Sequence, residues 1–438
     1  MNSIALLLAY AFLGTLLGTL LGLIPAMHIY AAAAFVIAAP ATIDVPAGAP
    51  AFLCLGLLIG WAFSSNVPAI FLFAPDEGAA TAVLPATRML LQGRAEIALR
   101  MLVAGALGGL AVLLALSPIA DTVLRPLLKI MQPHTTWMVI AALVFLVLGE
   151  WPRVDETHPT PLRRLAAAWA YLGAGQLTFW LSGLLGLVLM YRSPLPIDAA
   201  QQNLLPAFTG LFTLPGLLQI TLFGAQPPPQ IKHVEDPSFG SWLRGVLIGL
   251  GGGLFAAVLP VISGGIGSLL AGHASAQREE RIFLIAQGAS RTTYLTAGYL
   301  LLFLPGVAVA RGGMSALLIT RDAPAGWQMY WAAIGAAGIC GATAAMLTLL
   351  CGALFARTAH RLPVRSVAVI ALLIALTITW IFTGAAGLSV AAVGALIGMI
   401  PVLGGGRRMN ALGVLLIPIS LNLTGVGSNV AKFLGLLS

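Results

Sequence analysis

The stretch "GTLLGTLLGLIPAMHIYAAAAF", residues Gly14–Phe35, joins a predicted apolar helix to a proline. Gly14 and Gly18 are four residues apart, so they share one helix face and allow a neighbouring backbone to approach closely. Pro25 removes a helical hydrogen bond, and His28 follows in a region free of charged residues. Inside a bilayer, the freed backbone is tolerated only against protein or a water-filled cavity. The stretch therefore predicts a broken or re-entrant helix, with a tight interhelical loop at the membrane surface as the alternative.

The composition predicts an integral membrane protein. The hydrophobic fraction is 59%, the mean hydropathy is +0.98, and charged residues make up only 8%. A spanning helix needs roughly 20 predominantly apolar residues, and the chain contains many such runs. We predict an all-α integral membrane protein with about ten to twelve transmembrane helices, located in the cytoplasmic membrane of a bacterium or archaeon.

The charged residues do not point to nucleic acid, although the formal net charge is +8. The basic residues are dispersed over loops in ones and twos, which is typical of the positive-inside bias of membrane proteins. Arg407 and Arg408 follow a run of glycines and are predicted to be such an anchor. The three cysteines lie in apolar segments without CxxC spacing, so no disulfide framework or metal site is expected.

The chain is predicted to consist of two related halves. "GAQPPPQIKHVEDPSFG", Gly224–Gly240, is the most polar linker, and its three consecutive prolines forbid a continuous helix. It separates a first transmembrane repeat, residues 1–223, from a second, residues 241–438. Gly249, Gly253 and Pro260 of the second half repeat the spacing of Gly14, Gly18 and Pro25 at one common offset. Two broken segments in corresponding positions are a pointer to a transporter binding site.

Polar residues in apolar surroundings are the candidate site. Arg291 lies in an apolar run that also holds Gln287, and an arginine at the centre of a span must face a cavity or a partner. A guanidinium there would bind a carboxylate or phosphate in a bidentate manner, whereas an arginine nearer the interface would only extend to the headgroups. The remaining candidates are backbone donors at a predicted helix start and side chains able to line a cavity: Ser263, Gly264, Gly265, Ser64, Asn66 and His28. For His28 a structural role is favoured, and hydrogen bonding between helices explains Ser64 and Asn66 equally well.

Two further stretches carry a family resemblance, Ser65–Gly109 and "GALIGMIPVLGGGRRMNALGVLLIPISL", Gly394–Leu421. Together with the opening stretch they resemble the TctA-like permeases, the large membrane subunit of tripartite tricarboxylate transporters, and especially their shorter stand-alone relatives. The sequence departs from the family at Ala26 and Ala86, where glycine is expected after proline. Positions that match the family motif are Ala74, Pro75, Asp76, Glu77, Leu84, Pro85, Gly93 and Arg94.

The resemblance implies transport of a small organic anion such as a di- or tricarboxylate, driven by an ion gradient. Asp76 and Glu77 would then bind a coupling cation, sodium or a proton, although they would also serve as caps of the next helix. The alternative function is a flippase for a polyprenyl-phosphate or another anionic lipid carrier, because "LPVISGGIGSLLAG" (Leu259–Gly272) is similar to a motif of such flippases. No nucleotide-binding loop, zinc-protease motif or hydrolase elbow occurs, so no enzyme activity and no cofactor are expected. The expected partners are the anion, membrane lipids and further copies of the chain.

Overall fold

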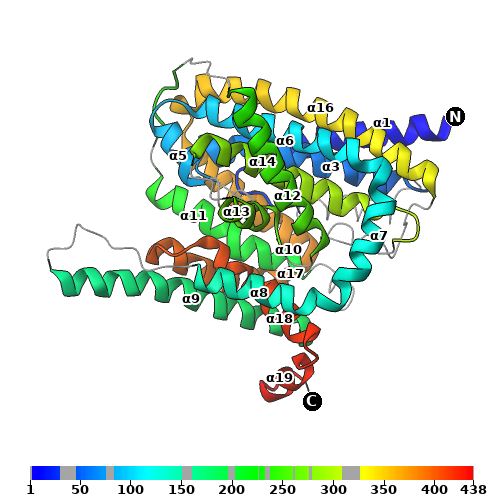
Figure 1. Ribbon diagram of the computed structural model, residues 1–438. Coiled ribbons are helices and arrows are strands. Elements are labelled where there is room, and N and C mark those ends of the chain that lie inside the picture. Colours follow the sequence, from blue (N-terminus) through cyan, green and yellow to red (C-terminus); the bar gives the residue numbers. More distant parts are fainter. Residues whose placement is uncertain are drawn as a thin grey trace. The chain divides into compact units, whose positions relative to one another are not determined.

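The computed structural model describes residues 2–29, 46–74, 83–149, 160–195, 203–224, 226–231, 237–259, 262–275, 279–307 and 326–437. These residues form helices joined by turns and loops, and no strand occurs among them (Figure 1). Eight helical segments of this part are long and apolar enough to cross a membrane, or nine if the bent pair Arg408–Leu423 and Gly427–Phe433 forms one span. The predicted all-α, multi-pass membrane fold is confirmed.

The helices group into two compact units, and each unit takes two separate stretches of the chain. Unit 1 comprises Met1–Gln132 and Ile220–Ala371, and unit 2 comprises Pro133–Gln219 and Leu372–Ser438. The described part of the predicted linker lies in unit 1, where Ile231 N donates to the Gly93 carbonyl at 2.8 Å and Gln230 Oε1 accepts from Ala95 N at 3.0 Å. The arrangement as two consecutive repeats stays a prediction.

Unit 1 contains the helices that carry the candidate site. The helices of unit 1 are α1 (Asn2–Gly22), α3 (Ala49–Ser64), α4 (Asn66–Phe71), α5 (Val83–Leu91), α6 (Ala95–Leu116), η2 (Ser117–Ile119), α7 (Ala120–Met131), α12 (Phe239–Val258), α13 (Gly264–Ala274), α14 (Glu280–Leu300), α16 (Trp327–Thr358) and η6 (Ala359–Arg361), together with the last residues of α11 (Leu214–Phe223) and the first residues of α17 (Val364–Gly404).

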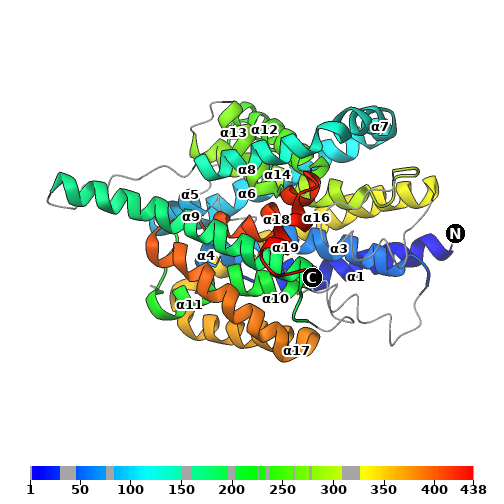
Figure 2. The same cartoon turned by 90° about the horizontal axis from the view of Figure 1, so that it is seen from below.

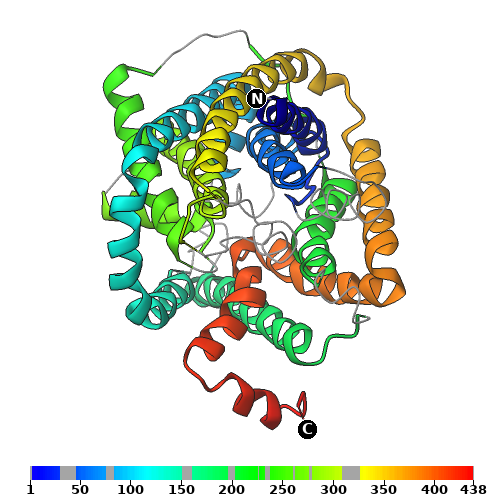
Figure 3. The same ribbon diagram turned by 90° about the vertical axis from the view of Figure 1, so that its right-hand side faces the viewer.

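Glycines hold α1 and α3 in close contact. A Cβ atom at Gly14 or Gly18 would collide with the backbone of α3, and one at Gly56 or Gly60 of α3 would collide with the backbone of α1. The two glycine pairs therefore interlock in the small-xxx-small manner. Figure 3 shows α1 and α3, in dark and lighter blue, side by side, with α16, in yellow, packed along them.

Glycines also surround α14, the most polar of the long helices. A Cβ atom at Gly249 or Gly253 of α12 would meet the backbone of α14, and so would one at Gly105 or Gly109 of α6. Figure 2 shows α12, α13 and α14 grouped together, in agreement with their contacts. Because its neighbours approach so closely, α14 buries polar side chains that would be costly to expose to lipid.

Unit 2 contains α8 (Thr135–Leu148), α9 (Pro161–Tyr191), α10 (Leu204–Phe208), the π-helical turn η5 (Thr209–Thr213), η7 (Arg408–Leu412), α18 (Gly413–Leu423) and α19 (Gly427–Phe433). It also contains the larger part of three elements that cross the boundary between the units, η3 (Gln132–His134), α11 and α17. Glycines again allow close packing, since a Cβ atom at Gly186 of α9 would collide with Val414 of α18, and one at Gly413 with Phe179 of α9. Within α17, Gly384 has a non-helical backbone (φ 62°, ψ −162°).

Candidate functional site

The first broken segment follows α1 and turns back against α3. The helix ends at Gly22, ahead of Pro25, because a residue that precedes proline is disfavoured in the α conformation. Ala26 has a φ of 54°, in the left-handed region where glycine is the usual residue. The Trp61 indole nitrogen donates to the Met27 carbonyl at 3.1 Å. His28 is 3% exposed, and its ring centroid lies 6.3 Å from that of Trp61.

A one-residue turn at Ser65, called the α3–α4 break below, separates α3 from α4, and its backbone angles stay close to helical (φ −64°, ψ −14°). The Ser65 hydroxyl donates to the Trp61 carbonyl at 2.7 Å, and Asn66 Nδ2 donates to the Phe63 carbonyl at 2.9 Å. Such local bonds compete with the regular helical ladder. With their donor groups engaged in this way, the Ser65 and Asn66 oxygens are held ready to accept hydrogen bonds from another element.

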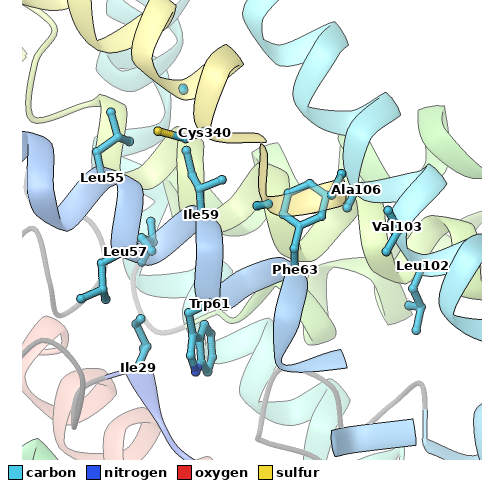
Figure 4. Packing of buried hydrophobic residues seen from close by; sticks show 14 of the residues in the cluster. Ile29, Leu55, Leu57, Ile59, Trp61, Phe63, Leu102, Val103, Ala106 and Cys340 are labelled. Carbon is cyan, nitrogen blue, oxygen red and sulfur yellow. The ribbon is translucent and has the colours of Figure 1, made fainter. Parts of the chain in front are cut away.

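Arg291 of α14 reaches this break and is 4% exposed. Its Nη2 donates to Ser65 Oγ at 2.9 Å and its Nη1 to Asn66 Oδ1 at 3.4 Å. The guanidinium carbon lies 4.6 Å from the centroid of the Trp61 ring, a cation–π contact. Figure 4 shows the Trp61 indole pointing to the side of α3 on which Ile29 lies. Trp61 thus connects the first broken segment to the arginine.

The second broken segment reaches the same arginine from α12 and α13. The first of these helices ends at Val258, Leu259 is extended (φ −89°, ψ 134°), and α13 begins at Gly264. Ser263 caps α13 by accepting from Ile266 N at 3.4 Å, which confirms the predicted helix start. The Gly264 carbonyl accepts from Ser290 Oγ at 2.7 Å. A Cβ atom at Gly264 would lie 2.8 Å from the Arg291 Cα, so only glycine fits there.

Gln287 lies one helical turn before Arg291 on α14. It is 3% exposed, and its Nε2 atom is buried without a hydrogen-bond partner among the described residues. A buried amide donor without a partner is costly. Residues four apart share a helix face, so this donor and the guanidinium are neighbours on α14.

The structure brings together most of the predicted site residues, namely His28, Asn66, Ser263, Gly264 and Arg291, with Pro25 and Gly265 in the same two segments and Gln287 one turn away. Pro260, Asp76 and Glu77 lie outside the described residues. The interpretation of Arg291 as an interfacial residue is wrong, because α14 begins at Glu280 and buries the side chain.

Sequence reasoning missed Trp61 and Ser65. Both lie in the stretch "WAFSSNVP", where an aromatic residue precedes three consecutive polar side chains and a proline within an apolar helix. That pattern is the signal that was available. The contact of Trp61 with Arg291 joins residues that are far apart in the sequence, so no local pattern predicts it.

The fold and this site define a multi-pass membrane protein with a buried cationic centre at the meeting point of two broken segments and a third, hydroxyl-rich helix break. The sequence model of the tripartite tricarboxylate transporter TctA family matches residues 8–413. The chain belongs to this family.

A protein of Methanocaldococcus jannaschii, described as uncharacterized, is 24% identical over 300 residues, which cover 64% of this chain and 65% of the relative. The alignment therefore spans less than two thirds of that protein. No solved structure matches the chain.

Proposed function

We propose that this chain transports a small organic anion, such as a di- or tricarboxylate, across the cytoplasmic membrane of a bacterium or archaeon. The observation that carries the proposal is the position of Arg291, buried in a membrane unit where both proline-broken segments and the α3–α4 break meet. Membership in the TctA family supports the class of substrate.

The chemistry of the site suits a carboxylate. A guanidinium offers planar, paired N–H donors that match the two oxygens of a carboxylate. The Arg291 guanidinium carbon lies 4.6 Å from the centroid of the Trp61 ring, and Gln287 adds a buried amide donor one helical turn away. A substrate with a second oxygen-bearing group would use that additional donor.

The site is closed in this structure. Ser65 is 7% exposed, Asn66 4% and Arg291 4%. A substrate reaches the guanidinium only after the surrounding helices move, which is the alternating access expected of a secondary transporter. We assign the coupling cation, sodium or a proton, to Asp76 and Glu77, as the family motif implies.

The family match gives no support to the alternative of a lipid-carrier flippase. The two functions also differ in what would compete at Arg291, because a flippase would bind a polyprenyl phosphate in preference to a soluble carboxylate.

Transport in proteoliposomes tests the proposal. Uptake of radiolabelled citrate and succinate would be measured with imposed sodium and proton gradients, with polyprenyl phosphate as a competitor. We expect gradient-driven carboxylate uptake that Arg291→Gln abolishes, while Arg125→Gln, a change at a half-exposed arginine paired with Asp121, leaves it intact. Uptake that survives in Arg291→Gln, or that is absent for every carboxylate while the lipid phosphate binds, would exclude the proposal.

A further inference from the structure

Unit 2 contains a partly buried arginine, Arg408, which the proposed transport site does not use. The helix α17 ends at Gly404, and Gly405 follows with a φ of 73°. A Cβ atom at Gly405 would collide with the ring of Tyr171 on α9. Glycine is therefore required here for the loop to pack against α9, and Arg408 follows as the first residue of η7.

The Arg408 guanidinium is only partly satisfied. Its Nη2 atom donates to Gln219 Oε1 of α11. Its Nη1 atom is buried and has no hydrogen-bond partner among the described residues. An anchoring arginine would extend its charged end to the headgroup region, whereas Arg408 turns one nitrogen away from all solvent. The positive-inside anchor expected of Arg408 stays a prediction, and the burial of Nη1 calls for a partner inside the unit.

The neighbouring Arg407 has a structural explanation that Arg408 lacks. Its Nη1 atom lies 3.6 Å from the position that a Cβ atom of Gly149 would take, at the C-terminal end of α8. Cations are favourable at helix C-termini because the macrodipole is negative there. The two arginines are adjacent in the sequence, but only one of them lies at a helix end that favours its charge.

The charge of Arg408 is not balanced within the described part of unit 2. This part, residues 133–149, 160–195, 203–219 and 372–437, contains no aspartate and no glutamate. A buried charge needs an opposite charge and hydrogen bonds to be tolerated. An anion with oxygen acceptors would supply the hydrogen-bond partner that Nη1 lacks among the described residues.

We propose that Arg408 and Gln219 form an oxyanion-binding site in unit 2, distinct from the site at Arg291. Gln219 Oε1 fixes the guanidinium plane through Nη2, which leaves Nη1 to donate to the anion. Because its oxygen is engaged, the Gln219 amide presents its NH₂ group as a further donor. The ligand carries a carboxylate or phosphate group, and its source is either a soluble carboxylate or the phosphate of a lipid headgroup.

Ligand-dependent thermal stability of the full-length protein in detergent tests this site, since a ligand that binds the folded state raises the apparent melting temperature. The titrations use inorganic phosphate, citrate, and phosphatidylglycerol in mixed micelles, with phosphatidylcholine as the uncharged lipid control. They are run on the wild type and on Arg291→Gln, so that the outcome does not depend on the transport proposal. We expect Arg408→Gln to raise the apparent Kd by about tenfold or more, and Arg407→Gln to change it much less.

Gln219→Glu provides a test that does not remove the arginine. The new carboxylate would pair with Arg408 and occupy the guanidinium, so the unliganded protein should melt at a higher temperature and its response to the anion should be lost. A response to citrate or inorganic phosphate identifies a soluble ligand, and a response to phosphatidylglycerol alone identifies a lipid headgroup. The proposal is overturned if the responses to all three probes are the same in Arg408→Gln and Gln219→Glu as in the parent protein.

Discussion

The substitution Trp61→Phe separates the contribution of the indole from that of a merely apolar side chain. Trp61 is 1% exposed, donates to the Met27 carbonyl at 3.1 Å and lies 4.6 Å beneath the Arg291 guanidinium. Phenylalanine keeps an aromatic ring but has no N–H group. The buried Met27 carbonyl would lose its donor, at a cost of about 1–3 kcal/mol. The weaker cation–π contact and the smaller ring would add about 1 kcal/mol each.

We therefore expect Trp61→Phe to lower the free energy of unfolding by about 3–5 kcal/mol. Of these losses, only the weaker cation–π contact acts directly on the guanidinium. Its cost of about 1 kcal/mol corresponds to an approximately fivefold lower affinity for the carboxylate. The assay combines unfolding of the purified protein in detergent with a titration of the transported carboxylate.

Trp331→Phe is the matched control for this experiment. Trp331 belongs to α16 of the same unit but is 45% exposed, so the same change of side chain should cost less than about 1 kcal/mol. If Trp61→Phe were no more destabilising than Trp331→Phe, or if it left the affinity for the carboxylate unchanged, the role assigned to Trp61 would be refuted.

Three further changes test the packing around the site. Ala26→Gly should raise the free energy of unfolding by up to about 1 kcal/mol, because Ala26 has a φ of 54° and a left-handed alanine is strained; the midpoint of thermal unfolding measures it. Gly105→Ala should lower the free energy of unfolding by about 1–3 kcal/mol, since the added methyl group would collide with the Ile285 carbonyl of α14; a smaller loss in the same melt would contradict the close packing of α6 and α14. Arg88→Gln breaks the exposed pair with Glu280 and should change stability by less than about 1 kcal/mol, with a difference that disappears in high salt.

The sequence predicted the elements of the site more successfully than their partners. The glycine spacing in α1 and α12, the helix start at Gly264 and the burial of Arg291 all follow from local patterns, because a helix face and a cap are properties of neighbouring residues. The expectation that Pro25 ends the helix was close, since α1 stops three residues earlier, at Gly22.

The membrane fold and the existence of broken helices were determined by the sequence alone. In lipid, a helix satisfies its own backbone hydrogen bonds, so an apolar composition favours helices. Proline removes one of these bonds and favours a break, as it does after Gly22, although α7, α17 and α18 each contain a proline without ending there. The tertiary structure alone decided which residues meet at the breaks. Arg291 lies more than two hundred residues from both Trp61 and Ser65 in the sequence, and Arg408 lies 189 residues from Gln219. Such contacts depend on how closely the backbones approach, and glycines permit that approach without specifying which helix will take the place beside them.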